Sequence, residues 1–161
     1  MKQIKLVGHM IYVQVDDEDY ELLNRYDWWI CRTKYTAYAQ TKIDDKIILM
    51  HRLILPLTGG LTVDHKDGNG LNNQKENLRP ATVSQQKQNS RKQADTSSVY
   101  KGVHWNSADR VWVAAIYIKG KQKYLGRFQS EIAAAKAYNR AAKEHFGEFA
   151  KLNVLPIIKV S

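Results

Sequence analysis

The stretch Val63-Asp64-His65-Lys66-Asp67-Gly68-Asn69 decides the fold, because it joins a short apolar segment to a turn rich in glycine and asparagine. Two further polar clusters follow closely: Leu71-Asn72-Asn73, and Glu76-Asn77-Leu78-Arg79. The pattern predicts strands at Leu61–Val63 and Asn77–Ala81, separated by this loop.

A helix is predicted directly after the second strand. Residues 84–92 are polar and basic, and Ser84 is a candidate N-cap. The local order is therefore strand, loop, strand and helix. Before it, His51 to Leu55 is predicted to form a short helix or strand that ends at Pro56.

The Asp64-His65 pair supplies two different chemistries. A carboxylate is a hard ligand that suits Mg²⁺ or Mn²⁺. A histidine that stays neutral near pH 7 can accept a proton from water. Adjacent strand residues point to opposite faces unless the backbone distorts. Together with nearby orienting amides, this set favours hydrolysis of a phosphodiester bond.

Residues 51–92 resemble the HNH endonuclease family, in the subgroup found among phage and homing-type nucleases. The linked pattern Asp-His-x-x-Gly, Leu-x-Asn and Glu-Asn-Leu-Arg carries the resemblance. It implies a ββα-metal fold with one Mg²⁺ or Mn²⁺ per active site. By resemblance, Asp64 binds the metal, His65 is the general base and Asn77 orients the histidine ring.

One position departs from the family pattern. The family commonly carries a metal-binding Asn or His nine residues after the middle asparagine, where this chain has Gln86. Its amide oxygen can ligate a metal, but its arm is one carbon longer. Asn89 lies three residues further, on the same helical face, so both remain candidate ligands.

Three further residues could have either a functional or a structural role. His51 and Arg52 match a frequent His-Arg pair upstream of the motif, and Arg52 could bind phosphate. Alternatively, both residues hold the loop by hydrogen bonds. Asn73 could likewise serve only to hold the turn.

Composition suggests a polyanionic partner for most of the chain. The 161 residues carry a net charge of +9, with −1 in residues 1–50 and +10 in the remainder. No apolar run is long enough for a membrane helix and no signal peptide is evident, which favours the cytoplasm of a bacterial or phage-infected cell. Cys31 is the single cysteine, so an intramolecular disulfide is excluded.

Residues 1–50 are predicted to form short strands and one helix. Residues 4–6 and 11–15 are rich in strand formers, and acidic residues open a helix at 16–23. Asp44-Asp45 is expected to form a hairpin turn. This region is assigned to the nuclease half, and the small polar residues 93–98 to a linker.

Residues 99–155 are predicted to form a three-stranded meander backed by one helix. The strands are expected at 99–103, 111–118 and 123–128, and the helix begins near Ser130 and ends at Gly147. The whole chain is therefore assigned to the α+β class.

This third region closely resembles the plant ethylene-response-factor (Apetala-type) DNA-binding domain. The resemblance rests on Tyr100-Lys101-Gly102-Val103, Tyr124-Leu125-Gly126-Arg127-Phe128 and the alanine-rich segment 133–142. It implies that the sheet enters the major groove of double-stranded DNA. The candidate DNA-binding residues are Lys101, Arg110, Trp112, Lys119, Lys121, Lys123 and Arg127.

The departures from the plant pattern bear on the target. This chain has His104-Trp105 where the plant domains have arginines, and Ala115 and Tyr117 where they have Glu and Arg. A guanine-rich target is therefore not expected to carry over. The leading interpretation is a site-directed DNA endonuclease; the alternative is a weak or inactive nuclease that acts as a DNA-binding regulator.

Overall fold

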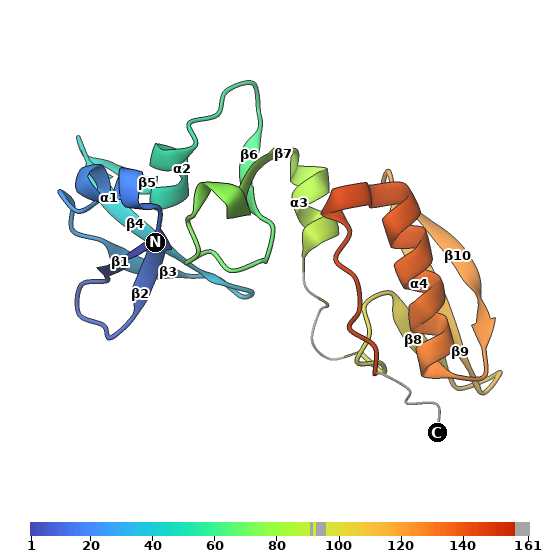
Figure 1. Ribbon diagram of the computed structural model, residues 1–161. Helices are drawn as coiled ribbons and strands as arrows, with labels where there is room; N and C mark the ends of the chain where they lie inside the picture. The colour runs from blue at the N-terminus through green and yellow to red at the C-terminus, as the bar shows by residue number, and fades with distance from the viewer. Residues whose placement is uncertain (91, 93–95, 157–161) are drawn as a thin grey trace. The chain divides into compact units, whose positions relative to one another are not determined.

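The computed structural model describes residues 1–90, 92 and 96–156, which belong to two compact units, 1–86 and 87–161 (Figure 1). Small antiparallel sheets and short helices make up both units, so the class is mixed α+β. The linker expected at 93–98 includes residues 93–95, which lie outside the described residues.

The first unit contains three small sheets, in which β1 pairs with β2, β4 pairs with both β3 and β5, and β6 pairs with β7. Its elements are β1 (Lys2–Lys5), β2 (Tyr12–Val15), α1 (Asp17–Leu23), β3 (Trp29–Arg32), β4 (Ala37–Ile43), β5 (Lys46–Leu49), α2 (Met50–Ile54), β6 (Thr62–His65), η1 (Lys75–Asn77) and β7 (Leu78–Ala81). Helix α3 (Val83–Asn89) crosses from the first unit into the second.

A single apolar cluster holds the N-terminal part of this unit together. Fully buried side chains from β2, α1, α2 and the loops between them form it: Leu6, Val13, Val15, Leu23, Trp28 and Met50. Burying one such side chain stabilises the fold by about 1.5–3 kcal/mol. Trp28 also satisfies its indole N–H by donating to the carbonyl of Leu23 at 2.8 Å.

The hairpin between β4 and β5 confirms the expected turn. Asp44 and Asp45 both adopt left-handed backbone conformations, with φ of 47° and 60°. Two consecutive positive φ values characterise the type I′ turn, whose twist matches that of the flanking strands.

Helix α3 begins one residue before the predicted start, and its cap differs from the expectation. Thr82 Oγ1 accepts the backbone N–H of Gln85 at 3.2 Å, and Gln85 Oε1 accepts the backbone N–H of Thr82 at 2.8 Å. This reciprocal pair is a capping box. Thr82 therefore has the N-cap role that was expected of Ser84.

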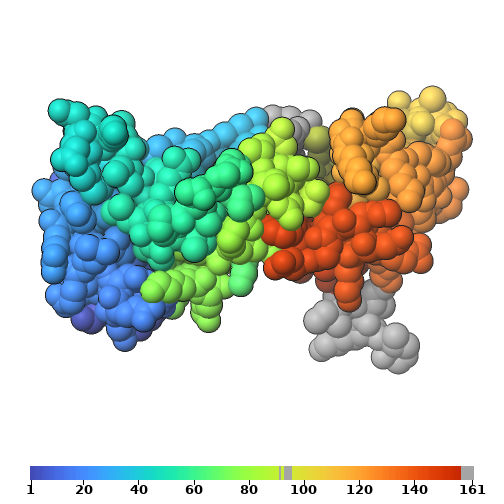
Figure 2. Space-filling view, turned by 90° about the horizontal axis from the view of Figure 1, so that it is seen from above, coloured from blue at the N-terminus to red at the C-terminus, as the bar shows by residue number. Residues whose placement is uncertain are grey.

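The N-terminal strands bind the loop between β6 and β7. Gln14 donates its N–H to Leu71 at 2.9 Å and accepts from the N–H of Asn73 at 2.8 Å. Asp16 Oδ2 accepts the backbone N–H of Lys75 at 2.7 Å. In the space-filling view the blue N-terminal residues lie against the green residues of this loop (Figure 2). Residues 1–50 and the Asp-His motif are therefore parts of one structure.

The second unit is a three-stranded antiparallel sheet covered by one helix (Figure 1). Its further elements are β8 (Val103–Asn106), β9 (Val111–Ile118), β10 (Lys121–Phe128), α4 (Glu131–Phe146) and η2 (Gly147–Phe149). Alanines at 134, 135 and 142 are fully buried and let α4 lie close to the sheet. The strand expected at 99–103 begins only at Val103, because the preceding residues form a turn in which Gly102 has φ of 74°.

In the described part of the chain, no helix is long and apolar enough to cross a membrane.

Candidate functional site

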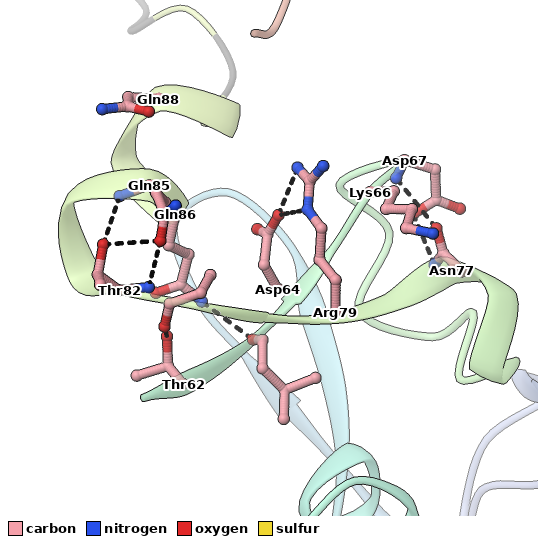
Figure 3. Close-up of polar contacts among 12 residues, drawn as sticks. Thr62, Asp64, Lys66, Asp67, Asn77, Arg79, Thr82, Gln85, Gln86 and Gln88 are labelled. Carbon is pink, nitrogen blue, oxygen red and sulfur yellow. Dashed lines mark hydrogen bonds and ion pairs between the residues drawn. The ribbon is translucent and has the colours of Figure 1, made fainter. Parts of the chain in front are cut away.

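The hairpin of β6 and β7 places Asp64 directly opposite Arg79. Arg79 donates from Nε to Asp64 Oδ2 at 2.9 Å, and its Nη2 lies 2.8 Å from the same oxygen (Figure 3). Both side chains are less than a tenth exposed. A buried carboxylate requires such a partner, because an unpaired charge in the interior is costly.

His65, the next residue, lies within reach of a different polar partner. Its Nε2 is 3.1 Å from Oδ1 of Asn73, which is fully buried. Asn73 Nδ2 donates to the carbonyl of Gly70 at 3.5 Å, which places the amide nitrogen on the side away from the ring. An amide oxygen can only accept, so in the neutral ring Nε2 carries the hydrogen and Nδ1 is the unprotonated nitrogen.

Two rings from outside the motif surround His65. The ring centroid of His51, on α2, lies 5.1 Å from that of His65 at nearly a right angle. The ring of Tyr38, on β4, lies 5.7 Å from His65 and 5.4 Å from His51. Gly70 allows this arrangement, since a Cβ there would lie 2.4 Å from Tyr38 Cδ1. These two rings limit the orientations open to the imidazole of His65.

Burial keeps both histidines neutral. Desolvation, then the neighbouring His65 and Arg52, lowers the pKa of His51 to about 3. Desolvation also lowers the pKa of His65, and its bond to Asn73 and the charges of Asp67 and Asp64 oppose this only in part. At neutral pH, His65 is therefore an unprotonated base.

The side chain of Asn77 makes its hydrogen bonds with the loop that follows His65. Its Oδ1 accepts the backbone N–H of Asp67 at 3.1 Å, and its Nδ2 donates to Asp67 Oδ1 at 3.0 Å and to the carbonyl of Asn72 at 2.8 Å. Figure 3 shows Asn77 and Asp67 together at the loop end of the hairpin, apart from the Asp64–Arg79 pair. The structure therefore gives the ring contact to Asn73, because Asn77 ends η1 just before β7 and faces the loop that follows His65.

The candidate metal ligands are one carboxylate and neutral amides. Gln86 Nε2 donates to the carbonyl of Val63 at 3.3 Å, which anchors the side chain beside β6 (Figure 3). Asn89 is buried at the end of α3 and belongs to the second unit. Among the described residues, no group of three or more His, Cys, Asp and Glu could hold a metal.

This donor set fits Mg²⁺ or Mn²⁺ better than zinc. Mg²⁺ is commonly held by one or two carboxylates, water and substrate phosphate. One carboxylate with an amide oxygen meets that need, whereas zinc needs several nitrogen or sulfur ligands.

Arg52, the expected phosphate contact, is exposed on α2.

The charge separates sharply between the two units. The first has eleven Lys/Arg and eleven Asp/Glu, whereas the second has fourteen Lys/Arg and five Asp/Glu. The whole net charge of +9 therefore lies in residues 87–161.

Two of the lysines expected to contact DNA, Lys121 and Lys123, lie on the side of the sheet that faces α4. Residues paired directly across strands share a face of the sheet. Lys123 is paired with Ile116, which packs against α4, and its Nζ lies 3.3 Å from Nε2 of His145 on that helix. Lys121 is paired with Ile118 on the same side. Both lysines therefore project on the helix-covered side of the sheet.

Two more of these candidates are held within the unit. Lys101 Nζ donates to the carbonyls of Gln88 and Ser90 at 2.7 Å each, where α3 ends. Burial, with the nearby Lys151, lowers its pKa to about 8. Trp112 packs into the core beneath α4. The contacts of Lys101 and Trp112 therefore stabilise the fold of the second unit.

The remaining three expected DNA-binding residues are exposed, as Lys121 and Lys123 also are. Arg127 is paired with Val113, on the face away from α4, and its Nη1 lies 3.0 Å from Asp109 Oδ2. Arg110 and Lys119 lie in turns with φ of 53° and 50°. Their side chains are therefore accessible to a phosphate backbone.

Sequence reasoning missed two residues of the site. Arg79 was quoted within the motif, and the strand register, which pairs it with Asp64, is the signal that could have identified it. Tyr38 has no such signal, because its contact with His65 joins separate sheets.

Comparison with known proteins supports both resemblances. An uncharacterised HNH endonuclease of Acanthamoeba polyphaga mimivirus is 32% identical over 153 residues, covering 91% of this chain and 75% of that protein. Protein 3.8 of Escherichia phage T7 is 31% identical over 97 residues, covering 60% of this chain and 78% of that protein. An AP2-like ethylene-responsive transcription factor of Arabidopsis thaliana is 44% identical over 57 residues, which are 35% of this chain and 12% of that protein. No family model and no solved structure matches the chain.

Proposed function

Since this chain belongs to the HNH endonuclease family, we propose that it is a site-directed, homing-type DNA endonuclease that requires a divalent metal. The first unit would cut DNA, and the sheet of the second unit would hold the duplex through its major groove. The observation that carries the proposal is the buried pair of His65 and Asn73, with the buried carboxylate of Asp64 at the preceding position of β6.

His65 is the general base in this proposal. Asn73 holds Nε2–H, so Nδ1 can take a proton from the attacking water. The rings of Tyr38 and His51 restrict the imidazole, and the low pKa of His51 prevents a second positive charge beside it.

Asp64 and Gln86 would hold one Mg²⁺ or Mn²⁺ ion. When bound, such an ion supplies positive charge to the scissile phosphate and stabilises the leaving oxygen. Asp64 provides the charged ligand, and Gln86 provides a neutral oxygen from the start of α3. Arg79 balances the Asp64 carboxylate and sets its position on the hairpin.

The excess positive charge of the second unit supports its role in binding DNA. Lysine and arginine side chains release counterions when they neutralise phosphates, so binding weakens steeply as salt rises. Arg110 and Lys119 are suitable phosphate contacts, because both lie exposed in the turns of the sheet.

Cleavage of supercoiled plasmid DNA tests the proposal. The purified chain is incubated with Mg²⁺, with Mn²⁺ and with EDTA, beside the His65→Ala variant. Nicking or cutting should require the metal and should be lost in the variant, while DNA binding remains. If His65→Ala cuts at the parent rate, the assignment of the base is wrong.

A DNA-binding regulator without nuclease activity is the second candidate. The ion pair between Arg79 and Asp64 favours it, because a guanidinium already contacts the carboxylate expected to bind metal. Gln86 in place of the usual Asn or His favours it too. Metal titration by calorimetry separates the candidates: only the nuclease should bind Mg²⁺ or Mn²⁺ in a manner that Asp64→Asn weakens.

A further inference from the structure

The sheet of the second unit has one face away from α4, which we call the outer face. Strand pairing defines it: His104, Val113 and Arg127 form one row across the sheet, Ala115 pairs with Tyr124, and Tyr117 pairs with Gln122. The alternate residues Val103, Ala114 and Ile116 pack beneath α4. Successive strand residues point to opposite sides, so the two sets are separated.

A β-bulge preserves this division along β10. The register shifts between Tyr124 and Gly126, and the extra residue, Leu125, packs with the core clusters under α4. Tyr124 before the bulge and Arg127 after it consequently share the outer face. The bulge therefore brings an aromatic ring and a guanidinium to the same surface.

The outer face is aromatic, amide-bearing and nearly uncharged. Tyr117 and Tyr124 are 65% and 57% exposed, and His104 and Gln122 are exposed beside them. Val113 and Ala115, between these side chains, are buried. Arg127 is its one cationic side chain among the paired residues, and Asp109 lies 3.0 Å from its guanidinium.

These groups suit one class of base pair. In the major groove, arginine and lysine read guanine, whereas glutamine makes two hydrogen bonds to adenine. Small apolar and aromatic groups contact the methyl group of thymine. The lysines that could read guanine, Lys121 and Lys123, project on the opposite side.

Charge complementarity indicates duplex DNA as the occupant of this face. All of the net positive charge of the chain lies in this unit, and Arg110 and Lys119 stand in turns at the ends of β9. Basic residues at the margins can contact the two phosphate backbones, while the neutral centre meets the base edges.

We propose that the outer face selects A·T-rich duplex DNA, with Gln122 reading adenine and with Tyr117 contacting thymine methyl groups. This inference rests on the proposed function, since it names the target class of the DNA-binding sheet. Arg127 would limit guanine recognition to one position, and its partner Asp109 weakens even that contact by competing for the guanidinium.

Selection from random duplex DNA tests the inference. The full chain carrying His65→Ala, kept in EDTA so that no DNA is cut, is equilibrated with the pool, and the bound sequences are read. A·T base pairs should be enriched in the region that the protein covers. Affinities for matched A·T-rich and G·C-rich duplexes, and for single-stranded DNA, are then measured by fluorescence anisotropy.

Three variants in the same background identify the residues responsible. Gln122→Ala should reduce the preference for the A·T-rich duplex by about fivefold or more, the discrimination expected of one bidentate contact. Tyr117→Arg should shift the preference toward the G·C-rich duplex. Lys123→Ala, on the helix-covered side, is the matched control and should leave the base preference unchanged. All three side chains are exposed, so the fold should persist, and circular dichroism checks this.

Each outcome either supports or overturns the inference. Salt-dependent duplex binding without A·T enrichment, or Gln122→Ala with an unchanged preference, overturns it and leaves the proposed endonuclease intact. Tighter binding to single-stranded DNA would make this face a stacking surface for unpaired bases and overturn it as well. Absence of any DNA binding overturns both the inference and the proposed role of the second unit.

Discussion

Replacing Asn73 with alanine tests the geometry of the active site most directly. The substitution removes the oxygen that lies 3.1 Å from His65 Nε2. It leaves a buried N–H without its acceptor, which costs about 1–3 kcal/mol of stability. The ring is then free to change tautomer or rotate, and a misplaced catalytic group lowers the rate by roughly 100-fold. This corresponds to about 2.7 kcal/mol in activation free energy.

The assay compares single-turnover cleavage by Asn73→Ala, Asn73→Asp and Asn77→Ala. Asn73→Asp keeps an acceptor oxygen for His65, so it should recover most of the lost rate. Asn77→Ala loosens the loop at Asp67 but leaves the ring contact, so its rate should fall less than tenfold. Urea denaturation of each variant corrects for unfolded protein. A normal rate for Asn73→Ala, with activity abolished in Asn77→Ala, would refute this reasoning and restore Asn77 as the orienting residue.

The remaining predictions concern stability. Burial lowers the pKa of His51 from 6.5 to about 3. Between these pH values the unfolded chain binds more protons at His51 than the folded chain does. The stability that depends on neutral His51 should therefore be complete above pH 6.5 and fall by about 1.4 kcal/mol per pH unit on acidification. Urea titrations from pH 7 to 4 measure this slope, and a His51→Gln variant should reduce it to the contribution that remains from His65. Arg79→Ala should lower the free energy of unfolding by about 3–5 kcal/mol, because Asp64 loses a buried partner; a loss below 1 kcal/mol would contradict the buried pair. Gly102→Ala should cost about 1–3 kcal/mol, because the new Cβ would lie 2.0 Å from Tyr138 Cδ2; an unchanged melting temperature would argue against the close approach of α4.

Local patterns were sufficient for much of the secondary structure. The acidic opening of α1, the Asp44-Asp45 turn and the glycine that ends α4 depend on the preferences of neighbouring residues. Strand β8 was misplaced because its limit depends on a turn before Val103, where Gly102 meets the ring of Tyr138 from α4. The start of α3 was signalled by the Thr82-x-x-Gln85 spacing, which was available in the sequence.

For the candidate site too, the sequence predicted some residues, and the structure was needed for others. The sequence identified Asp64 and His65, because a carboxylate and an imidazole in a Gly/Asn-rich hairpin carry a recognisable chemistry. It did not distinguish Asn73 from Asn77, which are both amides in one loop. That distinction depends on hydrogen bonds from β2 that hold the backbone at residue 73.

The sequence by itself determined the family, the concentration of basic residues toward the C-terminus and the Asp-His pair, since these depend on residue types and short spacings. Only the tertiary structure decided that Tyr38 packs against His65, that Arg79 neutralises Asp64 and that Lys123 projects away from the outer face. The physical reason is that side-chain direction and long-range contacts depend on strand register and packing, which single residues do not encode.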